Sequence, residues 1–183
     1  MMLQQLWNIF LCLVLDFPKC KFDGKVPGGI LSTAEYSGKW FMLAMAADSK
    51  ATVVRYTAVD SAAFVLTSVK DRQILHAKGA LRLSQSMECN PQQWTYQVDK
   101  TTQELTLEGS PFRKIEIFVV KPTEALMFLD TQDEGPETFT RLYLYGRSPT
   151  MSEFSHQEFE QRAKSLNLNN IAVLKQVREP CEI

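Results

Sequence analysis

The chain has 183 residues, a length typical of a single domain, and its hydrophobic content of 45% is ordinary for one globular core. Its 20 lysine and arginine residues are spread along the sequence and nearly balance 21 aspartate and glutamate residues, so the net charge is -1. This balance excludes the basic footprint of a nucleic-acid-binding protein, and no block of basic residues indicates attachment to a membrane surface.

The first distinctive segment is an apolar run from Leu6 to Leu15, in which Asn8 is the only polar residue. The run is too short to span roughly 30 Å of hydrocarbon, but its length is typical of the core of a secretory signal. No Lys or Arg precedes it, and no small-x-small cleavage site follows it. We therefore expect a signal-like segment over residues 1–20 and a folded, secreted domain over residues 21–183. Two interpretations stay open: the signal is cleaved, or it remains as an anchor.

Alternating apolar and polar residues, separated by turn residues, predict a series of short strands after a glycine-rich loop. The predicted strands cover residues 38–46, 62–69, 74–83, 92–98, 104–108, 114–120, 125–129 and 139–147. Asn90-Pro91 and Gly109-Ser110-Pro111 are expected to interrupt the pattern, and residues 47–60 carry no clear pattern. A short final strand is expected over residues 171–176.

The strand over residues 139–147 carries large apolar groups on both faces, which predicts that it is covered on both sides. Its first face holds Phe139, Arg141, Tyr143 and Tyr145. A helix follows, and capping-box spacing places its start at either Thr150–Glu153 or Ser155–Glu158. Eight antiparallel strands with short links and one helix predict an all-β, up-and-down barrel wide enough for one small ligand. A two-sheet sandwich is the alternative.

Two sequence motifs connect this pattern with a known family. Gly38-Lys39-Trp40 and the stretch from Tyr145 to Ser148, followed by a helix, resemble the opening and closing signatures of the lipocalins. The resemblance covers Ser37 to the C-terminus, and it implies that Arg147 stacks on Trp40 and shuts the bottom of the barrel. The stretches 89–96 and 179–183 resemble the lipocalins that travel on lipoprotein particles and carry sphingosine-1-phosphate. The resemblance thus implies a monomeric lipid carrier whose partners are such a lipid and a lipoprotein surface.

The four cysteines are Cys12, Cys20, Cys89 and Cys181. In a secreted protein Cys89 and Cys181 are the natural pair, and the family resemblance implies the same bond. Closing a loop of about 90 residues is worth roughly 4 to 5 kcal/mol in the chain-entropy model. Cys20 is then left without a partner.

The barrel interior is the place where we expect a ligand. Trp94, Tyr96, Tyr143, Tyr145 and Phe139 are expected to form an aromatic wall, with Gln92 beside them. Further interior candidates are Phe64, Leu66, Leu81, Leu83, Phe118, Leu126 and Phe128.

Arg141 is the exception on this apolar face, because a buried guanidinium without a partner is too costly to leave alone. Its partner is either a carboxylate of this chain or an anionic ligand, and the resemblance places a phosphate-binding Arg at this position. The family's other anion-binding positions correspond to Gln92 and Ser110 here, so Arg113 or Lys114 could substitute for the missing charge.

The sequence gives no indication of an enzyme or of a cofactor. His76 and His156 lie in different elements, and there is no metal-spaced Cys/His set, no phosphate-binding glycine loop and no nucleophile elbow. Two hypotheses remain. The first is a secreted, lipoprotein-anchored carrier of an amphipathic lipid such as sphingosine-1-phosphate. The second is a soluble lipocalin for another small apolar ligand, with a cleaved signal and a structural Arg141.

Overall fold

The computed structural model describes residues 36–69, 73–86, 88–99, 104–121, 124–134 and 137–183. The signal-like segment over residues 1–20, with its apolar run and with Cys12 and Cys20, therefore lies outside the described residues.

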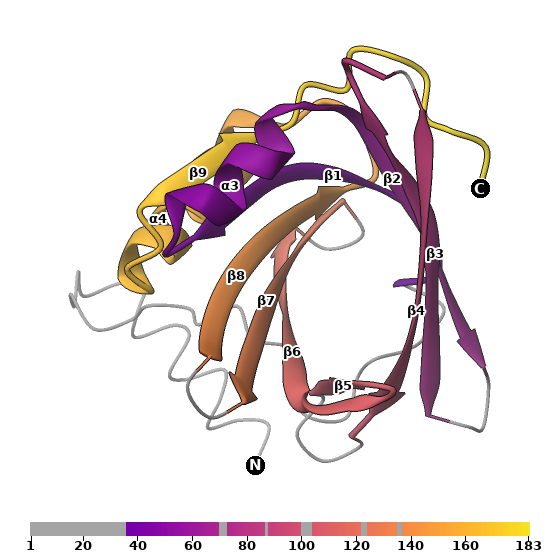
Figure 1. The fold of residues 1–183 in the computed structure, drawn as a ribbon, viewed down its shortest axis with the longest axis vertical. Coiled ribbons are helices and arrows are strands. Elements are labelled where there is room, and N and C mark those ends of the chain that lie inside the picture. The colour runs from indigo at the N-terminus through magenta and orange to yellow at the C-terminus, as the bar shows by residue number, and fades with distance from the viewer. Residues whose placement is uncertain (1–35, 70–72, 87, 100–103, 122–123, 135–136) are drawn as a thin grey trace, which may run out of the picture.

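The predicted eight-stranded barrel is confirmed. The strands that form it are β1 (Gly38–Ala47), β2 (Val59–Val69), β3 (Ile74–Leu83), β4 (Cys89–Val98), β5 (Leu105–Leu107), β6 (Ser110–Lys121), β7 (Ala125–Glu134) and β8 (Glu137–Gly146). Each strand pairs antiparallel with the next, and β1 closes the barrel by pairing with both β8 and β2. The strands curve around a single interior (Figure 1), so the sandwich alternative is wrong.

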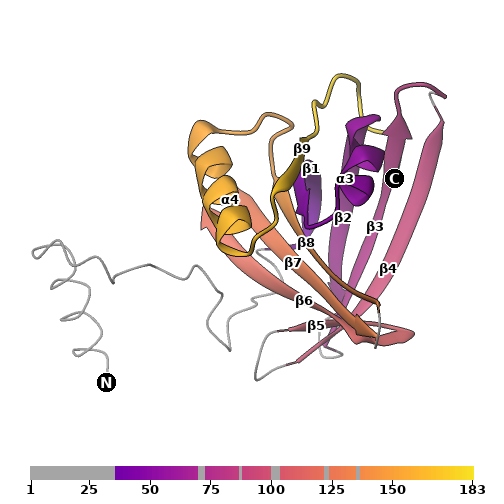
Figure 2. The same ribbon diagram turned by 60° about the vertical axis from the view of Figure 1, so that its left-hand side comes forward.

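A ninth strand, β9 (Asn170–Val173), pairs with β1 and ends earlier than predicted. The helix α4 (Glu153–Ser165) packs on the outer face of the barrel wall (Figure 2). The helix α3 (Lys50–Thr57) lies beside β1 and β9, and its Val53 belongs to the cluster inside the barrel. No helix in the described part of the chain has the length and apolar character needed to cross a membrane.

The helix α3 was not predicted. Its sequence, KATVVRYT, contains four β-branched residues, which favour strands, and Val53 is its one buried residue. The start of α4 also differs from both predicted capping boxes. Its N-cap is Ser152, whose Oγ accepts a hydrogen bond from the backbone N–H of Ser155 at 3.2 Å.

Two prolines lie inside strands where breaks were expected. Pro91 is in β4 opposite Ala80 of β3, and Pro111 is the second residue of β6. The other neighbour of β4 is β5, which pairs only with Tyr96–Val98. Among the described strands, the stretch around Pro91 therefore has a neighbour on one side only, and proline is found at such strand edges.

The apolar residues form two separate clusters, one on each side of the barrel wall. The inner cluster contains Trp40, Phe64, Tyr96, Phe128 and Tyr143. The outer cluster packs Leu142 and Leu144 of β8 under Phe159 and Ala163 of α4. The prediction that β8 is covered on both faces is thus confirmed. Phe118 belongs to the outer cluster, where Arg162 of α4 lies 4.5 Å from its ring centre, so its expected interior position is wrong.

Candidate functional site

One end of the barrel is closed by the two residues that the lipocalin signatures contribute. The guanidinium of Arg147 lies 3.7 Å from the ring centre of Trp40 and donates hydrogen bonds to the carbonyl oxygens of Ser37 and Lys39. The Trp40 indole N–H donates to the carbonyl of Tyr36 at 2.8 Å. Burial lowers the pKa of Arg147 from its usual range, but a guanidinium stays charged at any physiological pH, so this is a cation–π contact.

Gly38 makes this stack possible. Its φ is 100°, a conformation that side-chain-bearing residues rarely adopt, and a Cβ there would lie 3.1 Å from Nη1 of Arg147. The glycine of the opening signature therefore lets the backbone turn under the arginine.

Above this closed end the barrel encloses a cavity of about 250 Å³. Its wall contains six residues predicted for the site, namely Gln92, Trp94, Tyr96, Arg141, Tyr143 and Tyr145. A narrow apolar extension of about 30 Å³ shares part of that wall and reaches Trp40, Leu66, Ala77 and Leu126. The interior thus runs from an apolar floor at Trp40 toward a more polar chamber.

Aromatic rings form the boundary between the floor and the chamber. Phe64 contacts Trp94 and Tyr145, with ring centres 5.4 and 6.0 Å apart, and Tyr145 contacts Phe128 at 5.1 Å. Gly79 faces Phe64 across the β2–β3 ladder, and a Cβ at Gly79 would clash with the Phe64 ring and with the Ala63 carbonyl. The missing side chain of Gly79 therefore leaves the space that the Phe64 ring occupies.

The polar chamber contains three charged side chains on neighbouring strands. Arg113 of β6 binds Asp130 of β7 with two parallel hydrogen bonds, Nε to Oδ1 at 2.8 Å and Nη2 to Oδ2 at 2.6 Å. The Asp130 side chain is 1% exposed. The bond to Asp130 is the main reason why the pKa of Arg113 is raised. This bidentate pair leaves both carboxylate oxygens engaged.

Arg141 of β8 lies directly opposite Asp130 in the β7–β8 ladder. Its Nε is buried and has no hydrogen-bond partner. The Arg141 side chain forms no ion pair within the described residues. Its guanidinium rests on the ring of Phe139 at 4.0 Å. The carboxylate partner considered from the sequence is present nearby, but Arg113 holds it.

Tyrosine hydroxyls complete the chamber. The Tyr56 hydroxyl, supplied by α3, lies 3.5 Å from the Tyr143 hydroxyl. Burial raises the pKa of Tyr96, Tyr143 and Tyr145, so these phenols are neutral at physiological pH and can both donate and accept hydrogen bonds.

Several sequence candidates lie elsewhere. Leu83 is 38% exposed at the end of β3, and it does not belong to the cavity wall among the described residues. Lys114 is outside the barrel, where its Nζ lies 3.5 Å from Glu104. Of the two proposed substitutes, Arg113 is therefore the one that reaches the interior. Sequence reasoning missed Asp130 and Tyr56, although an Asp among the apolar residues of β7 was an available signal.

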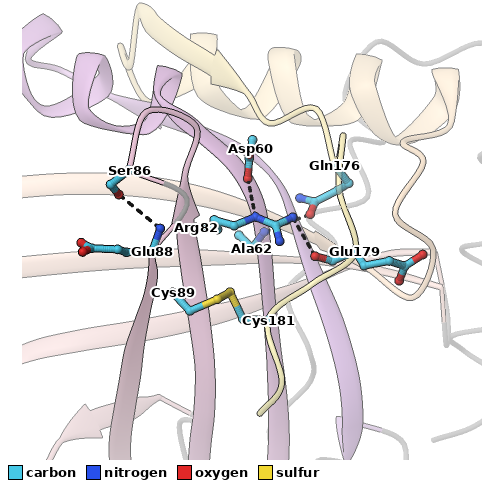
Figure 3. The surroundings of a disulfide bond; sticks show 9 residues. All are labelled: Asp60, Ala62, Arg82, Ser86, Glu88, Cys89, Gln176, Glu179 and Cys181. Carbon is cyan, nitrogen blue, oxygen red and sulfur yellow. Dashed lines mark hydrogen bonds and ion pairs between the residues drawn. A yellow bond between two sulfur atoms is a disulfide. The ribbon is translucent and has the colours of Figure 1, made fainter.

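The disulfide between Cys89 and Cys181 is confirmed (Figure 3). It ties the C-terminal segment to the start of β4. Nearby, the Arg82 guanidinium of β3 donates hydrogen bonds to the Asp60 carboxylate at 2.9 Å and to the backbone carbonyl of Glu179 at 2.7 Å. The C-terminal segment is thus fixed to the barrel wall at several points. In the described residues no cluster of three or more His, Cys, Asp or Glu could hold a metal ion.

Comparison with known proteins agrees with this architecture. The family named ApoM domain matches residues 2–183. Apolipoprotein M of Rattus norvegicus and of Mus musculus are each 26% identical over 148 residues, which is 80% of this chain and 75% of theirs.

Solved lipocalins share the fold. The siderocalin Ex-FABP, described as having dual ligand specificities, superposes with a TM-score of 0.68 at 17% identity, covering 81% of this chain and 95% of its own. Siderocalin Q83, described as having a dual ligand binding mode, superposes with a TM-score of 0.69 at 20% identity, covering 82% and 94%. The barrel, closed by Trp40 and Arg147, has the lipocalin fold, and the ApoM domain match over residues 2–183 places the chain in the ApoM domain family.

Proposed function

We propose that this protein is a secreted carrier of a single-chain lipid with an anionic head, and that sphingosine-1-phosphate is such a ligand. The lipid tail would lie against the aromatic wall and the apolar floor at Trp40. The head would lie in the polar chamber. A cavity of about 250 Å³ is below the roughly 300–1,000 Å³ of typical small-molecule pockets, which favours one slender chain over a two-chain lipid.

The observation that carries the proposal is the state of Arg141. Arg141 is half-buried, and its buried Nε without a partner costs the desolvation penalty of that group. The carboxylate opposite it, that of Asp130, is already bound by Arg113. An anionic head would supply the missing partner and gain charge-assisted hydrogen bonds. The neutral hydroxyls of Tyr56 and Tyr143 could add further hydrogen bonds to the head.

The family relation supports a carrier rather than an enzyme, and its members named apolipoprotein M suggest the surface on which the carrier acts. We propose that this chain also associates with lipoprotein particles, and that the apolar run from Leu6 to Leu15 stays on the mature protein as the anchor. Its length suits one lipid leaflet rather than a full bilayer.

Paired titrations of wild type and Arg141→Leu with sphingosine-1-phosphate and with sphingosine test the headgroup proposal. Arg141→Leu should weaken binding of the phosphorylated lipid by about 1.5 to 3 kcal/mol, the range for hydrogen bonds to charged groups, and binding of sphingosine by much less. Arg55→Leu, which removes an exposed arginine of α3, is the matched control and should leave both affinities unchanged. Equal losses for the two lipids in Arg141→Leu would mean that Arg141 has a structural role.

A further inference from the structure

The charges inside the barrel can be counted from the residues that line it. Arg113, Asp130 and Arg141 are the only groups of the described cavity wall that are charged at neutral pH, because the other titratable groups there are tyrosines. These tyrosines come from α3, β4 and β8, and burial raises the pKa of Tyr96, Tyr143 and Tyr145. Asp130 neutralises Arg113 through two hydrogen bonds. The chamber therefore offers one uncompensated positive charge, that of Arg141.

The Arg113–Asp130 pair also restricts what a ligand can do. A second negative charge on the head would have to compete with Asp130 for Arg113, and separating a buried pair leaves an uncompensated carboxylate. Asp130 lies directly opposite Arg141 on the neighbouring strand, so a doubly charged head at Arg141 would approach that carboxylate. Repulsion between like charges is strong at such a buried position.

Resting on the proposed function, we infer that this site selects lipid heads whose net charge is -1 and discriminates against dianionic heads. The class includes a fatty carboxylate, and also a phosphate whose neighbouring ammonium offsets one charge, as in sphingosine-1-phosphate. A plain alkyl phosphate at neutral pH lies outside the class. Asp130 is thus a specificity-determining residue that acts through Arg113 and through its own charge.

The test compares octadecanoate, octadecyl phosphate and octadecanol, which share one chain length, by quenching of tryptophan fluorescence. At about pH 8 the phosphate carries nearly two charges, and octadecanoate should bind about tenfold more tightly. At about pH 5, below the second phosphate pKa of about 6, the phosphate becomes a monoanion and the difference should fall to about twofold or less. A separate titration with sphingosine-1-phosphate tests the other singly charged head, a phosphate offset by a neighbouring ammonium, against the carboxylate. Sphingosine-1-phosphate should also bind more tightly than octadecyl phosphate at about pH 8.

Asp130→Asn provides the reciprocal test, because it leaves Arg113 and Arg141 both uncompensated. This variant should bind octadecyl phosphate at least as tightly as octadecanoate at about pH 8, whereas Asp133→Asn, an exposed position on the same strand, should keep the wild-type order. If wild type prefers octadecyl phosphate over octadecanoate at about pH 8 while octadecanol binds weakly, the inference is wrong and the proposed function stands. If octadecanol binds as tightly as both anions, the anionic head is wrong as well. The wild-type series decides the matter even if Asp130→Asn does not fold.

Discussion

The seam between β1 and β2 gives a prediction that can be worked out from individual hydrogen bonds. These strands pair only from Gly38–Phe41 to Ala63–Leu66, and beyond that point the C-terminal segment enters between them. The Gln176 side chain accepts a hydrogen bond from the Ala62 backbone N–H at 3.0 Å, and its Nε2 donates to the Met42 carbonyl at 2.6 Å. One amide side chain thus replaces a missing rung of the ladder.

Replacing Gln176 with Leu keeps the size of the side chain but removes both bonds. Ala62 and Met42 are fully or almost fully buried, so their backbone groups would lose their partner without gaining water. Each net hydrogen bond is worth about 0.5 to 1.5 kcal/mol and an orphaned buried group costs about 1 to 3 kcal/mol, so we expect a loss of about 2 to 4 kcal/mol in the free energy of unfolding.

Urea denaturation followed by tryptophan fluorescence measures this change, provided that the slope of the transition is the same in both proteins. Gln93→Leu is the matched control, because Gln93 is exposed on β4. It should change stability by less than about 0.5 kcal/mol. A loss of less than about 0.5 kcal/mol for Gln176→Leu as well would refute the role of this side chain in closing the barrel.

Three further predictions concern the disulfide, the tyrosines and the N-terminal segment. Replacing both Cys89 and Cys181 with Ser should lower the free energy of unfolding by about 4 kcal/mol, because the bond closes a loop over a separation of 92 residues; a loss under about 1 kcal/mol in calorimetry would contradict this. Burial raises the pKa of Tyr143 and Tyr145 above their ordinary 10.0, so the unfolded state ionises first and stability should fall as the pH rises beyond about 10. Tyr143→Phe should weaken that fall in pH-dependent denaturation, and an unchanged slope would speak against it. Inserting an Ala-x-Ala cleavage site after Leu15 should release a folded protein that no longer floats with lipoproteins, and N-terminal sequencing of the unmodified secreted protein that begins near Lys19 or Cys20 would rule out the retained anchor.

The barrel could be predicted from the sequence because apolar and polar residues alternate along most of its strands. Its two signature motifs also lie in the first and last strands of the barrel, as the lipocalin resemblance implies. Inward and outward positions of β8 were readable, since Arg141 and three aromatic residues alternate with Thr140, Leu142 and Leu144. In β6 the run from Ile115 to Val120 carries large apolar groups on both faces. Alternation alone therefore could not place Phe118, which packs under α4.

The misplaced elements have local causes that only the tertiary structure resolves. The β-branched residues of α3 favour a strand, and the helix forms where it packs against β1 and β9. Pro91 is tolerated because, among the described residues, no strand pairs with the other edge of β4 over that stretch. In both cases the surrounding strands, rather than the conformational preference of the residue itself, decide the local structure.

The charge arrangement of the site could be predicted only in part. The sequence identified Arg141 as a cation that needs a partner, and it identified Arg113 as one of two substitutes. It could not show that Arg113 and Asp130 bind each other, because the pairing depends on the register of β6 against β7, in which Arg113 lies opposite Gln132 and diagonal to Asp130. That register leaves Arg141 without a carboxylate of its own.

The most direct test of lipid carriage is mass spectrometry of the lipids extracted from the protein as secreted by cultured animal cells, compared between wild type and Arg141→Leu. Wild type should carry single-chain lipids whose heads have a net charge of -1, and Arg141→Leu should be depleted of them. Arg55→Leu should retain the wild-type lipids. Recovery of neutral lipids in equal amounts from wild type and Arg141→Leu would contradict the account.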